Sequence, residues 1–468
     1  MHAPTRRLGT STLVCALALL LALVLGGSAA ASGGLPRGAL IPVRGPGSCL
    51  GHGCLPLRGF GRSPGQIYTR SEGTVLGSNG INLTLSAGGG SVVVSGGFPQ
   101  ALAVLQRDRR TGAVRQPAGD AGCITQRRVH GCARAHLPFD GAAQLSADGR
   151  TLWIRPSEAH PNRWLRYVRD QHTGALLRSG TATACDVYLQ ARCPRLRGVQ
   201  SVDGVVPAGS TMLVLGNDRG GGALAVLARA GGSRWVQLPG AAGCANNHGA
   251  DGCAAVRCLW QDPGLVASAD DGRHLYVTPG YSDPEATEEG YLATFVRAPG
   301  GGVTPVGCVP TGYDRDAGFA PVWISTLPHS DTLLLLQIRG DRGDGRGWGQ
   351  FFASAPGRDG ALTKPRPLGG HNGLGPFYEG AAVTPDRRTL YAIANNGGIE
   401  AWHLAPNSVR RLPGTWGAVR SAPVNAGVYS VSGLLVSPDG RFLYAGFGSS
   451  DTSQVPTAPT LRVYRTTR

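Results

Sequence analysis

The sequence predicts an all-β protein, a seven-bladed β-propeller closed by pairing of its N- and C-terminal strands. Two observations predict it. A phrase of the type Ser-Pro-Asp-Gly-Arg-x-Leu-Tyr returns about every sixty residues, and a long fixed period is typical of repeat folds. Beyond the N-terminus, no segment keeps an apolar stripe at helical spacing, and short apolar runs bounded by turn residues favour strands.

The repeated phrase gives the copy number. It is clearest at residues 437–444, it recurs at 146–153, 268–276 and 384–391, and eroded copies lie at 86–93, 207–213 and 330–334. An Asp-Gly pair between apolar runs is a strong hairpin signal, because glycine accepts positive φ without steric cost. An apolar residue opens the strand after each turn: Val92, Leu152, Met212, Leu275, Leu333, Leu390 and Leu443.

A further strand follows each copy. These strands are predicted at 102–105, 165–168, 224–227, 292–295, 351–353, 399–402 and 461–464. Some of them run into a turn of the type Arg-Asp-x-x-Thr-Gly, at 107–112 and 169–174, and then into a short fourth strand. Four short antiparallel strands repeated radially make a propeller blade.

Ring closure is predicted from the two ends of the chain. The sequence ends in a strand at 461–465, and residues 49–54 resemble the segment that follows the fourth strand in other repeats. One blade built from both ends would remove the exposed edge of an open sheet. A β-solenoid or two β-sandwiches are the alternatives.

Residues 1–31 read as an export signal. Arg6 and Arg7 precede an apolar run at 13–25, and 29–31 are alanines suited to cleavage. The run is too short to span a membrane comfortably. The mature protein is therefore expected to be residues 32–468, secreted or associated with the cell envelope. Sec and Tat export both remain open.

The chain has a formal net charge of +16, and all but one of its 45 basic residues are arginines, the exception being Lys364. A basic exported protein can associate with anionic wall polymers or other anionic surfaces, and salt would weaken that binding. The arginines are scattered rather than clustered with aromatic residues, which argues against a nucleic-acid partner. The expected partner is an unidentified protein or a cell-wall polymer, and a monomer is expected.

Ten of the 11 cysteines lie outside the signal, an even number that favours disulfides in an exported chain. Small disulfide-closed loops between blades are predicted from four close pairs, which are Cys49 with Cys54, Cys123 with Cys132, Cys185 with Cys193, and Cys244 with Cys253. The remaining Cys258 and Cys308 occupy equivalent stages of successive repeats, which predicts a fifth bond between neighbouring blades. The spacings match no zinc pattern, and no metal or cofactor is expected.

The repeated phrase, followed by a strand and Arg-Asp-x-x-Thr-Gly, resembles the lactonase-like (YVTN-type) seven-bladed β-propellers. The Gly-Cys inserts at 122–132 and 243–253 resemble those of an exported actinobacterial group within that family. The resemblance implies the propeller fold, and the wider family includes 6-phosphogluconolactonases and surface-layer proteins. This chain departs from the pattern in its first, third and fifth copies, where Asp-Gly is lost.

Candidate catalytic residues are sparse. His371 lies in a glycine-rich stretch shortly before Glu379, and that stretch leads toward the innermost strand of a blade, near the channel mouth. His130 and His248 fall in the expected disulfide loops, where exposure to solvent explains them. The aspartates of the repeated phrase, such as Asp386 and Asp439, are expected to cap their own turns.

The sequence supports three functions. The leading interpretation is an exported binding or interaction module at the cell envelope, with an unknown ligand. The first alternative is a lactonase-like hydrolase with a site at the central channel opening, for which His371 and Glu379 are the candidates. The second alternative is a surface-structural protein. Whether the chain is an enzyme is left open by the residues; if it is one, lactone hydrolysis is the expected reaction.

Overall fold

The computed structural model describes residues between 37 and 467, with gaps. Arg37–Arg468 cluster as one compact unit. The described ranges are 37–51, 57–58, 81–86, 88–96, 101–125, 128–134, 143–145, 150–154, 165–170, 176–177, 196–208, 211–218, 221–229, 235–259, 263–268, 273–279, 291–310, 319–327, 332–339, 348–357, 361–372, 381–393, 398–405, 407–414, 429–449 and 460–467. The predicted signal and the boundary at residue 32 lie outside them.

The described strands form seven sheets, which we name blades 1 to 7. In each blade the innermost strand comes first. Blade 1 is β3 (Ile81–Leu85), β4 (Ser91–Gly96), β5 (Ala101–Arg107) and β6 (Val114–Arg115), with β7 (Cys123–Thr125) and β8 (Ala133–Arg134) added outside. Blade 2 is β9 (Ala143–Leu145), β10 (Thr151–Ile154), β11 (Leu165–Arg169) and β12 (Leu176–Leu177). Blade 3 is β13 (Ser201–Ala208), β14 (Thr211–Asp218), β15 (Gly221–Arg229) and β16 (Trp235–Gln237), with β17 (Cys244–Asn246) and β18 (Ala254–Ala255).

The later blades have the same order. Blade 4 is β19 (Pro263–Ser268), β20 (His274–Pro279), β21 (Tyr291–Arg297) and β22 (Val303–Pro310). Blade 5 is β23 (Phe319–Thr326), β24 (Leu333–Arg339), β25 (Trp348–Ser354) and β26 (Arg366–Asn372). Blade 6 is β27 (Ala381–Val383), β28 (Thr389–Ile393), β29 (Ile399–Ala405) and β30 (Ser408–Arg411). Blade 7 is β31 (Tyr429–Val436), β32 (Phe442–Ser449) and β33 (Thr460–Thr466), with β1 (Leu40–Pro42) and β2 (Cys49–Gly51) from the N-terminal side.

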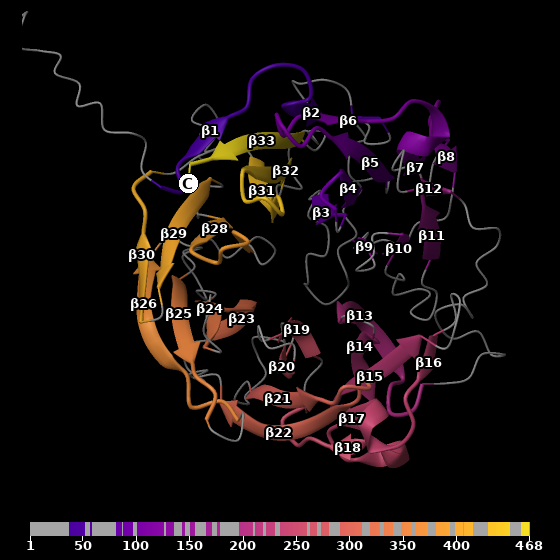
Figure 1. The fold of residues 1–468 in the computed structure, drawn as a ribbon, viewed down its shortest axis with the longest axis vertical. Coiled ribbons are helices and arrows are strands. Elements are labelled where there is room, and N and C mark those ends of the chain that lie inside the picture. The colour runs from indigo at the N-terminus through magenta and orange to yellow at the C-terminus, as the bar shows by residue number, and fades with distance from the viewer. Residues whose placement is uncertain are drawn as a thin grey trace, which may run out of the picture. The chain divides into compact units, whose positions relative to one another are not determined.

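The other described elements are three short 3-10 helices, at Gly119–Gly122, Ala241–Gly243 and Ala250–Gly252. Every strand that the repeated phrase predicts is present, since the seven opening residues all lie in the second strand of a blade. The predicted third strands are present as well. The all-β propeller prediction is therefore confirmed, and the blades follow one another around a centre in Figure 1.

The hydrophobic core lies between blades rather than inside one layer. In β24, Leu333 and Leu335 pack toward blade 4, whereas Leu334 and Leu336 pack toward blade 6. Because both faces of the sheet are covered, the strand is continuously apolar rather than alternating. Six of the seven core clusters combine side chains of two successive blades in this way.

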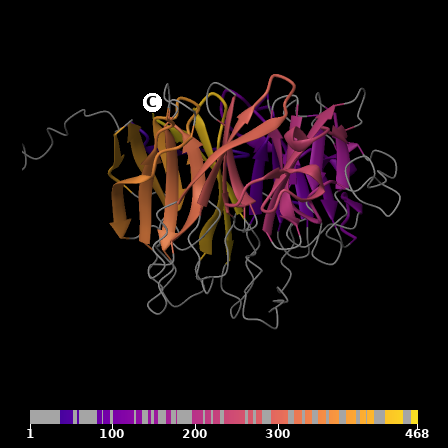
Figure 2. The same cartoon turned by 90° about the horizontal axis from the view of Figure 1, so that it is seen from below.

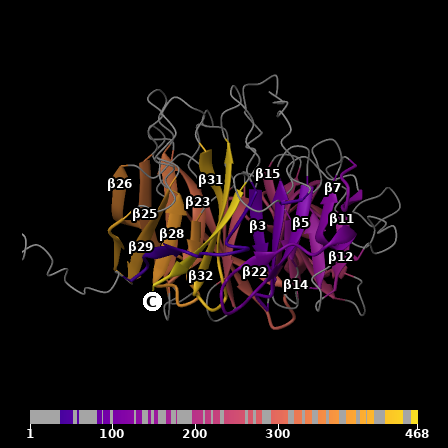
Figure 3. The ribbon, with the colours of Figure 1, turned by 90° about the horizontal axis from the view of Figure 1, so that it is seen from above.

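Blade 7 is completed from both chain ends, as predicted. Strands β1 and β2 both pair with β33 in antiparallel register. In blade 1, β6 and β7 pair with β5 in the same way. Figure 3 shows the indigo strand β3 beside the yellow strands β31 and β32, and both of these contact β3. The arrangement fits a closed ring.

The split blade reproduces a turn that blade 1 makes with continuous chain. In blade 1, the Gly112 amide donates to the Asp108 carbonyl at 2.9 Å, and the Asp108 amide donates to the Ala113 carbonyl at 2.8 Å. In blade 7, the Gly38 amide donates to the Thr467 carbonyl at 2.9 Å, and the Thr467 amide donates to the Ala39 carbonyl at 3.0 Å. Gly38 and Gly112 both have a left-handed φ, of 79° and 76°. The two chain ends together therefore replace a single third-to-fourth-strand turn.

Candidate binding face

One face of the ring is formed by short turns, and we call it the turn face. In each antiparallel sheet, the turn from the first to the second strand and the turn from the third to the fourth strand lie at the same end. Figure 2 shows the coloured strands that face the viewer running across the thickness of the ring, which places these ends toward one face. The repeated phrase and the Arg-Asp-x-x-Thr-Gly turn therefore meet there.

The phrase folds into a turn held by its aspartate. In blade 7, Asp439 Oδ1 accepts hydrogen bonds from the Ser437 hydroxyl at 2.5 Å and from the Arg441 amide at 3.1 Å. The Ser437 hydroxyl also accepts from the Phe442 amide at 2.9 Å. Gly440 has a φ of 66°, which glycine adopts without strain. The expectation that the aspartate caps its own turn holds for this copy.

The copy in blade 6 has the same turn with a different residue at the glycine position. Asp386 Oδ1 accepts from the Thr384 hydroxyl at 2.6 Å and from the Arg388 amide at 3.2 Å. Arg387 stands where Gly440 stands in blade 7 and has a φ of 52°. A non-glycine residue there is strained, but the Arg387 guanidinium reaches the Thr326 hydroxyl of blade 5. The strained residue thus also joins two blades.

The aspartates of the phrase also bind arginines of the next blade. Arg107, at the end of β5, donates from Nη2 to the Asp439 carboxylate at 3.3 and 3.4 Å, and from Nη1 to the Gly89 carbonyl at 3.0 Å. Burial opposes ionisation of Asp439, but the hydrogen bonds from Ser437 and the Arg441 amide and the charge of Arg107 hold its pKa below its usual range. Blade 7 is thereby tied to blade 1.

Other junctions use the same chemistry with different donors. Arg37, from the N-terminal side, pairs with Asp386 at 2.9 Å and so connects blade 7 to blade 6. Arg169 donates to the Ser91 hydroxyl of blade 1, and Arg297 donates to the Thr211 hydroxyl of blade 3 at 2.8 Å. Burial lowers the pKa of both guanidinium groups. These arginines therefore hold neighbouring blades together.

The arginine of the phrase itself stays exposed. It occupies one equivalent position in four blades, where its carbonyl accepts an amide hydrogen bond from the third strand. These residues are Arg150, Arg273, Arg388 and Arg441, all exposed. Arg109 and Arg110 of the blade 1 turn are exposed on the same face. The turn face thus carries a repeating set of cations, a feature that the sequence analysis treated only as scattered charge.

The candidate catalytic residues are not brought together by described contacts. His371 lies in β26, the outermost strand of blade 5, where its backbone pairs with Gly349. It is therefore not on an innermost strand, although the chain after it leads to β27, which is innermost in blade 6. Glu379 lies outside the described residues. A catalytic role for the two stays a prediction.

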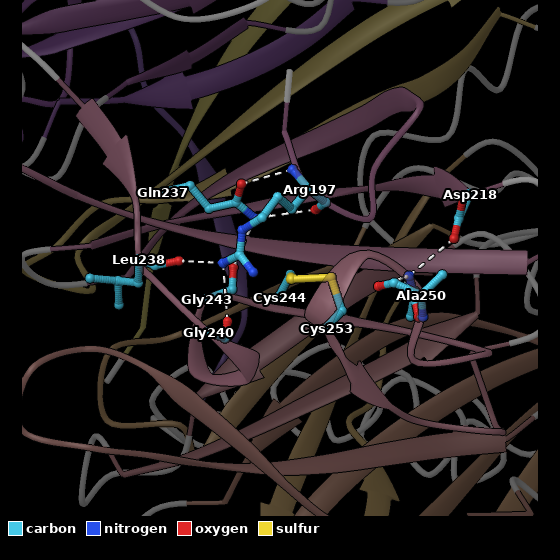
Figure 4. The surroundings of a disulfide bond; sticks show 10 residues. Arg197, Asp218, Gln237, Leu238, Gly240, Gly243, Cys244, Ala250 and Cys253 are labelled. Carbon is cyan, nitrogen blue, oxygen red and sulfur yellow. Dashed lines mark hydrogen bonds between the residues drawn. A yellow bond between two sulfur atoms is a disulfide. The ribbon is translucent and has the colours of Figure 1, made fainter. Parts of the chain in front are cut away.

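Two inter-blade loops are closed by disulfides, and each is clamped by an arginine. The Cys123–Cys132 and Cys244–Cys253 bonds each close a loop with a sequence separation of 9. Arg197 donates to the carbonyls of Leu238 and Gly240 at 2.7 and 3.0 Å, as Figure 4 shows. Arg58 donates to the carbonyl of Pro117, which is the equivalent of Leu238, and to the carbonyl of Gly131 next to the second cysteine.

The clamp has a second part in each loop. The amide side chain of Gln237 accepts from the Arg197 amide at 2.8 Å and donates to the carbonyls of Arg197 and Gly243. Gln116 repeats these contacts around Arg58. This module recurs in the sequence as Leu-Arg after a cysteine, at residues 57–58 and 196–197. That repeated signal was available to sequence analysis but was not used.

The remaining cysteines give one further confirmed bond and two predictions without a test. The Cys258–Cys308 bond, with a separation of 50, joins the segment after blade 3 to β22 of blade 4, as predicted. Cys49 is disulfide-bonded, but its expected partner Cys54 lies outside the described residues. Cys185 lies outside the described residues, and so does Cys193. The bond between Cys185 and Cys193 is therefore not tested and stays a prediction.

The two loop histidines behave as the sequence predicts. His130 follows the first cysteine of the Cys123–Cys132 loop, and His248 follows that of the Cys244–Cys253 loop. Both side chains are exposed. Exposure to solvent therefore explains their presence in these loops.

Comparison with known proteins gives similarity of structure only. No family model matches the chain, and no curated protein matches it. Solved structures that resemble it include a Lactobacillus plantarum protein, with 12% identity and a TM-score of 0.43 over 64% of this chain and 76% of that one. The β-propeller domain of Myceliophteria thermophila Cps50 (Swd1) has 13% identity and a TM-score of 0.44, over 85% of this chain and 98% of its own. A candidate 6-phosphogluconolactonase of Bacteroides uniformis also has 13% identity and a TM-score of 0.44, over 81% and 98%. At this level of similarity none of them bears on activity.

No helix among the described residues is both long and apolar enough to cross a membrane. No group of three or more histidine, cysteine, aspartate or glutamate side chains gathers in this part of the chain in a way that suits a metal ion.

Proposed function

We propose that this protein is an exported binding module that meets an anionic partner at the cell envelope through its turn face. The observation that carries the proposal is the exposed arginine at one equivalent position of four blades, namely Arg150, Arg273, Arg388 and Arg441. Arginine stays charged at any physiological pH, and its planar guanidinium suits phosphate and carboxylate groups. A cell-wall polymer with repeated anionic groups is the proposed partner.

The charge balance of the face supports this partner. The aspartates of the same turns already accept hydrogen bonds, Asp439 from Ser437 and Asp386 from Thr384. Asp108 is likewise engaged, because it accepts the amides of Arg110 and Thr111 at 2.7 and 3.1 Å. Two of these carboxylates also offset the connecting cations Arg107 and Arg37. The carboxylates of these turns thus serve the ring itself, whereas the four arginines of the phrase are exposed residues.

Export is part of the same proposal. The basic and apolar pattern of residues 1–31 fits a cleaved signal, and disulfides such as Cys123–Cys132 and Cys258–Cys308 suit an oxidising compartment. The repeated phrase fits membership of the exported lactonase-like (YVTN-type) propellers, and we propose a monomer. A repeated binding position on one ring allows several weak contacts to act together on one polymer.

The test measures co-sedimentation of the purified mature protein with immobilised poly(glycerol phosphate), at low and high salt. Replacing Arg150, Arg273, Arg388 and Arg441 by glutamine should weaken binding by roughly thirtyfold, since four exposed ion pairs at about 0.5 kcal/mol each sum to about 2 kcal/mol. The charge-matched control replaces four exposed arginines that do not belong to the repeated phrase, which are Arg128, Arg134, Arg257 and Arg410. Equal loss in both variants would reduce the effect to net charge and would overturn the proposed face.

A further inference from the structure

The turn between the first two strands of blade 1 has the same backbone hydrogen bonds as that of blade 7, but it lacks the aspartate. The Ser86 hydroxyl accepts from the Ser91 amide at 3.0 Å, as Ser437 accepts from Phe442. The Gly89 amide donates to the Ser86 carbonyl at 2.7 Å, as Gly440 donates to Ser437 at 2.8 Å. Gly89 and Gly440 have φ values of 65° and 66°. Gly88 therefore stands at the position of Asp439.

The groups that bind the aspartate in blade 7 are still present in blade 1. In blade 7 the carboxylate accepts from the Ser437 hydroxyl and from the Arg441 amide. The equivalent donors in blade 1 are the Ser86 hydroxyl, which is 4% exposed, and the Gly90 amide. Among the described residues, the Ser86 hydroxyl proton and the Gly90 amide have no acceptor, because their natural acceptor would come from position 88. A buried hydroxyl without an acceptor is a favourable place for an incoming anion.

Cations also converge on this turn. A Cβ atom placed on Gly88 would lie 3.4 Å from Arg109 Nη2, and one placed on Gly90 would lie 3.8 Å from the same atom. Arg109 is exposed and makes no ion pair with a described residue. Arg169 of blade 2 is buried at this junction and donates to the Ser91 hydroxyl, in the place that Arg107 takes at the next junction. Gly88 itself is exposed, so the position is open to solvent.

We propose that a carboxylate from outside the chain binds at Gly88–Gly90 and takes the place that Asp439 occupies in blade 7. It would accept from the Ser86 hydroxyl and the Gly90 amide and would pair with the Arg109 guanidinium. The ligand class is a carboxylate-bearing molecule, either a small organic acid or an acidic side chain of a partner protein. Two carboxylates of adjoining turns are already engaged, because Asp108 accepts from the Arg110 amide of its own turn and Asp439 accepts from Arg107.

This inference goes beyond the proposed function and does not depend on it. The polymer-binding set consists of Arg150, Arg273, Arg388 and Arg441, none of which belongs to the blade 1 turn. The carboxylate site uses Ser86, Gly88, Gly90 and Arg109. Loss of polymer binding would therefore leave the carboxylate site in place, and the reverse is also true.

The experiment places a carboxylate of the chain itself in the proposed site. Gly88→Asp restores the residue that blade 7 has, and its Cβ would meet only the flexible end of Arg109 at ordinary contact distance. We expect its Tm in chloride to exceed that of the wild type by about 1–2 °C. Gly300→Asp is the matched control, because Gly300 lies in the β21–β22 turn of the same face and a Cβ there meets nothing within 4 Å. It should leave Tm unchanged.

Ligand binding is read from Tm at constant ionic strength, with sodium acetate replacing sodium chloride. Acetate should raise the Tm of the wild type and of Gly300→Asp, and should not raise that of Gly88→Asp or Arg109→Gln. A blocked peptide containing one aspartate forms a second arm; a larger effect than that of acetate identifies a partner protein as the source, and a smaller one identifies a small organic acid. The same acetate effect in all four proteins, or a lower Tm for Gly88→Asp than for Gly300→Asp, would overturn the site.

Discussion

The Nε atom of Arg107 in blade 1 donates a hydrogen bond of 2.5 Å to the Tyr444 hydroxyl in blade 7, although 337 residues separate them. The Tyr444 hydroxyl in turn donates to the Gly112 carbonyl at 3.0 Å. Burial raises the pKa of Tyr444 to about 12, although Arg107 opposes the shift, so the hydroxyl keeps its proton. Arg107 belongs to one repeated phrase and Tyr444 to the other. The two repeated motifs are therefore hydrogen-bonded to each other between neighbouring blades.

Arg107 should be among the most sensitive surface-proximal residues. It is 8% exposed and also binds Gly89 and Asp439. Replacing it by methionine keeps the apolar stem but leaves the Tyr444 hydroxyl and the Asp439 carboxylate without this donor, at a cost of about 2–4 kcal/mol in the free energy of unfolding. Denaturant unfolding measures the change. Arg115→Met, which removes only an exposed hydrogen bond to Gln106, should cost less than about 0.5 kcal/mol.

Two tyrosines of the repeated phrase should respond oppositely to loss of the hydroxyl. Tyr444 is satisfied by Arg107 and Gly112, so Tyr444→Phe should destabilise the protein by about 1–2 kcal/mol. The buried Tyr391 hydroxyl has no hydrogen-bond partner among the described residues, and burial raises its pKa, with Asp386 adding to the shift. Tyr391→Phe should therefore be neutral or stabilising. Comparable destabilisation by both substitutions, measured by denaturant unfolding, would contradict this difference.

The sequence predicts the fold well because every blade has the same structural requirements, and these requirements produce the repeat. Each hairpin needs a turn with a left-handed residue, and each blade needs apolar residues on both faces, so the same phrase must return. Asp439 and Gly440 could be assigned to a turn, and Cys258 to Cys308, from position within the repeat alone. Contacts between blades depend instead on which side chains of one blade face those of the next blade. The length of the repeat does not predict these pairs.

The binding face was harder to predict for the same reason. The arginines are scattered in the sequence. The structure shows that Arg150, Arg273, Arg388 and Arg441 occupy one equivalent position in four blades. In the sequence, Gly88 belongs to an eroded copy of the phrase. The proposed binding role of this position depends on the Ser86 hydroxyl and on Arg109, which lies close to Gly88 only in the folded protein. His371 was expected near the channel because the chain leads inward after it, but the residue itself still belongs to the outermost strand.

Acid should weaken the ring through the aspartates of the turns. Although burial opposes the shift, hydrogen bonds hold the pKa of Asp386 and Asp439 below the usual value of 3.8. A carboxylate whose pKa is lower in the folded state contributes stability that is present above its unfolded pKa and is lost as pH falls through the folded pKa. Stability should therefore fall below about pH 4. The double substitution Asp386→Asn and Asp439→Asn should lower Tm at pH 7 and flatten the decline in acid. An unchanged slope of Tm against pH would show that other groups control it.

The disulfides should contribute to stability according to the length of chain that each one closes. In the chain-entropy model, the Cys258–Cys308 bond, with a separation of 50, restricts the unfolded chain more than Cys123–Cys132, with a separation of 9. The model gives about 4 kcal/mol for the first and about 2.5 kcal/mol for the second. The two double serine variants, compared by denaturant unfolding, should keep this order. The short loop has in addition the Arg58 contacts to the carbonyls of Pro117 and Gly131, which hold it in the folded state after the bond is removed. A reversed order would mean that the short loops, rather than the link between blades 3 and 4, limit unfolding.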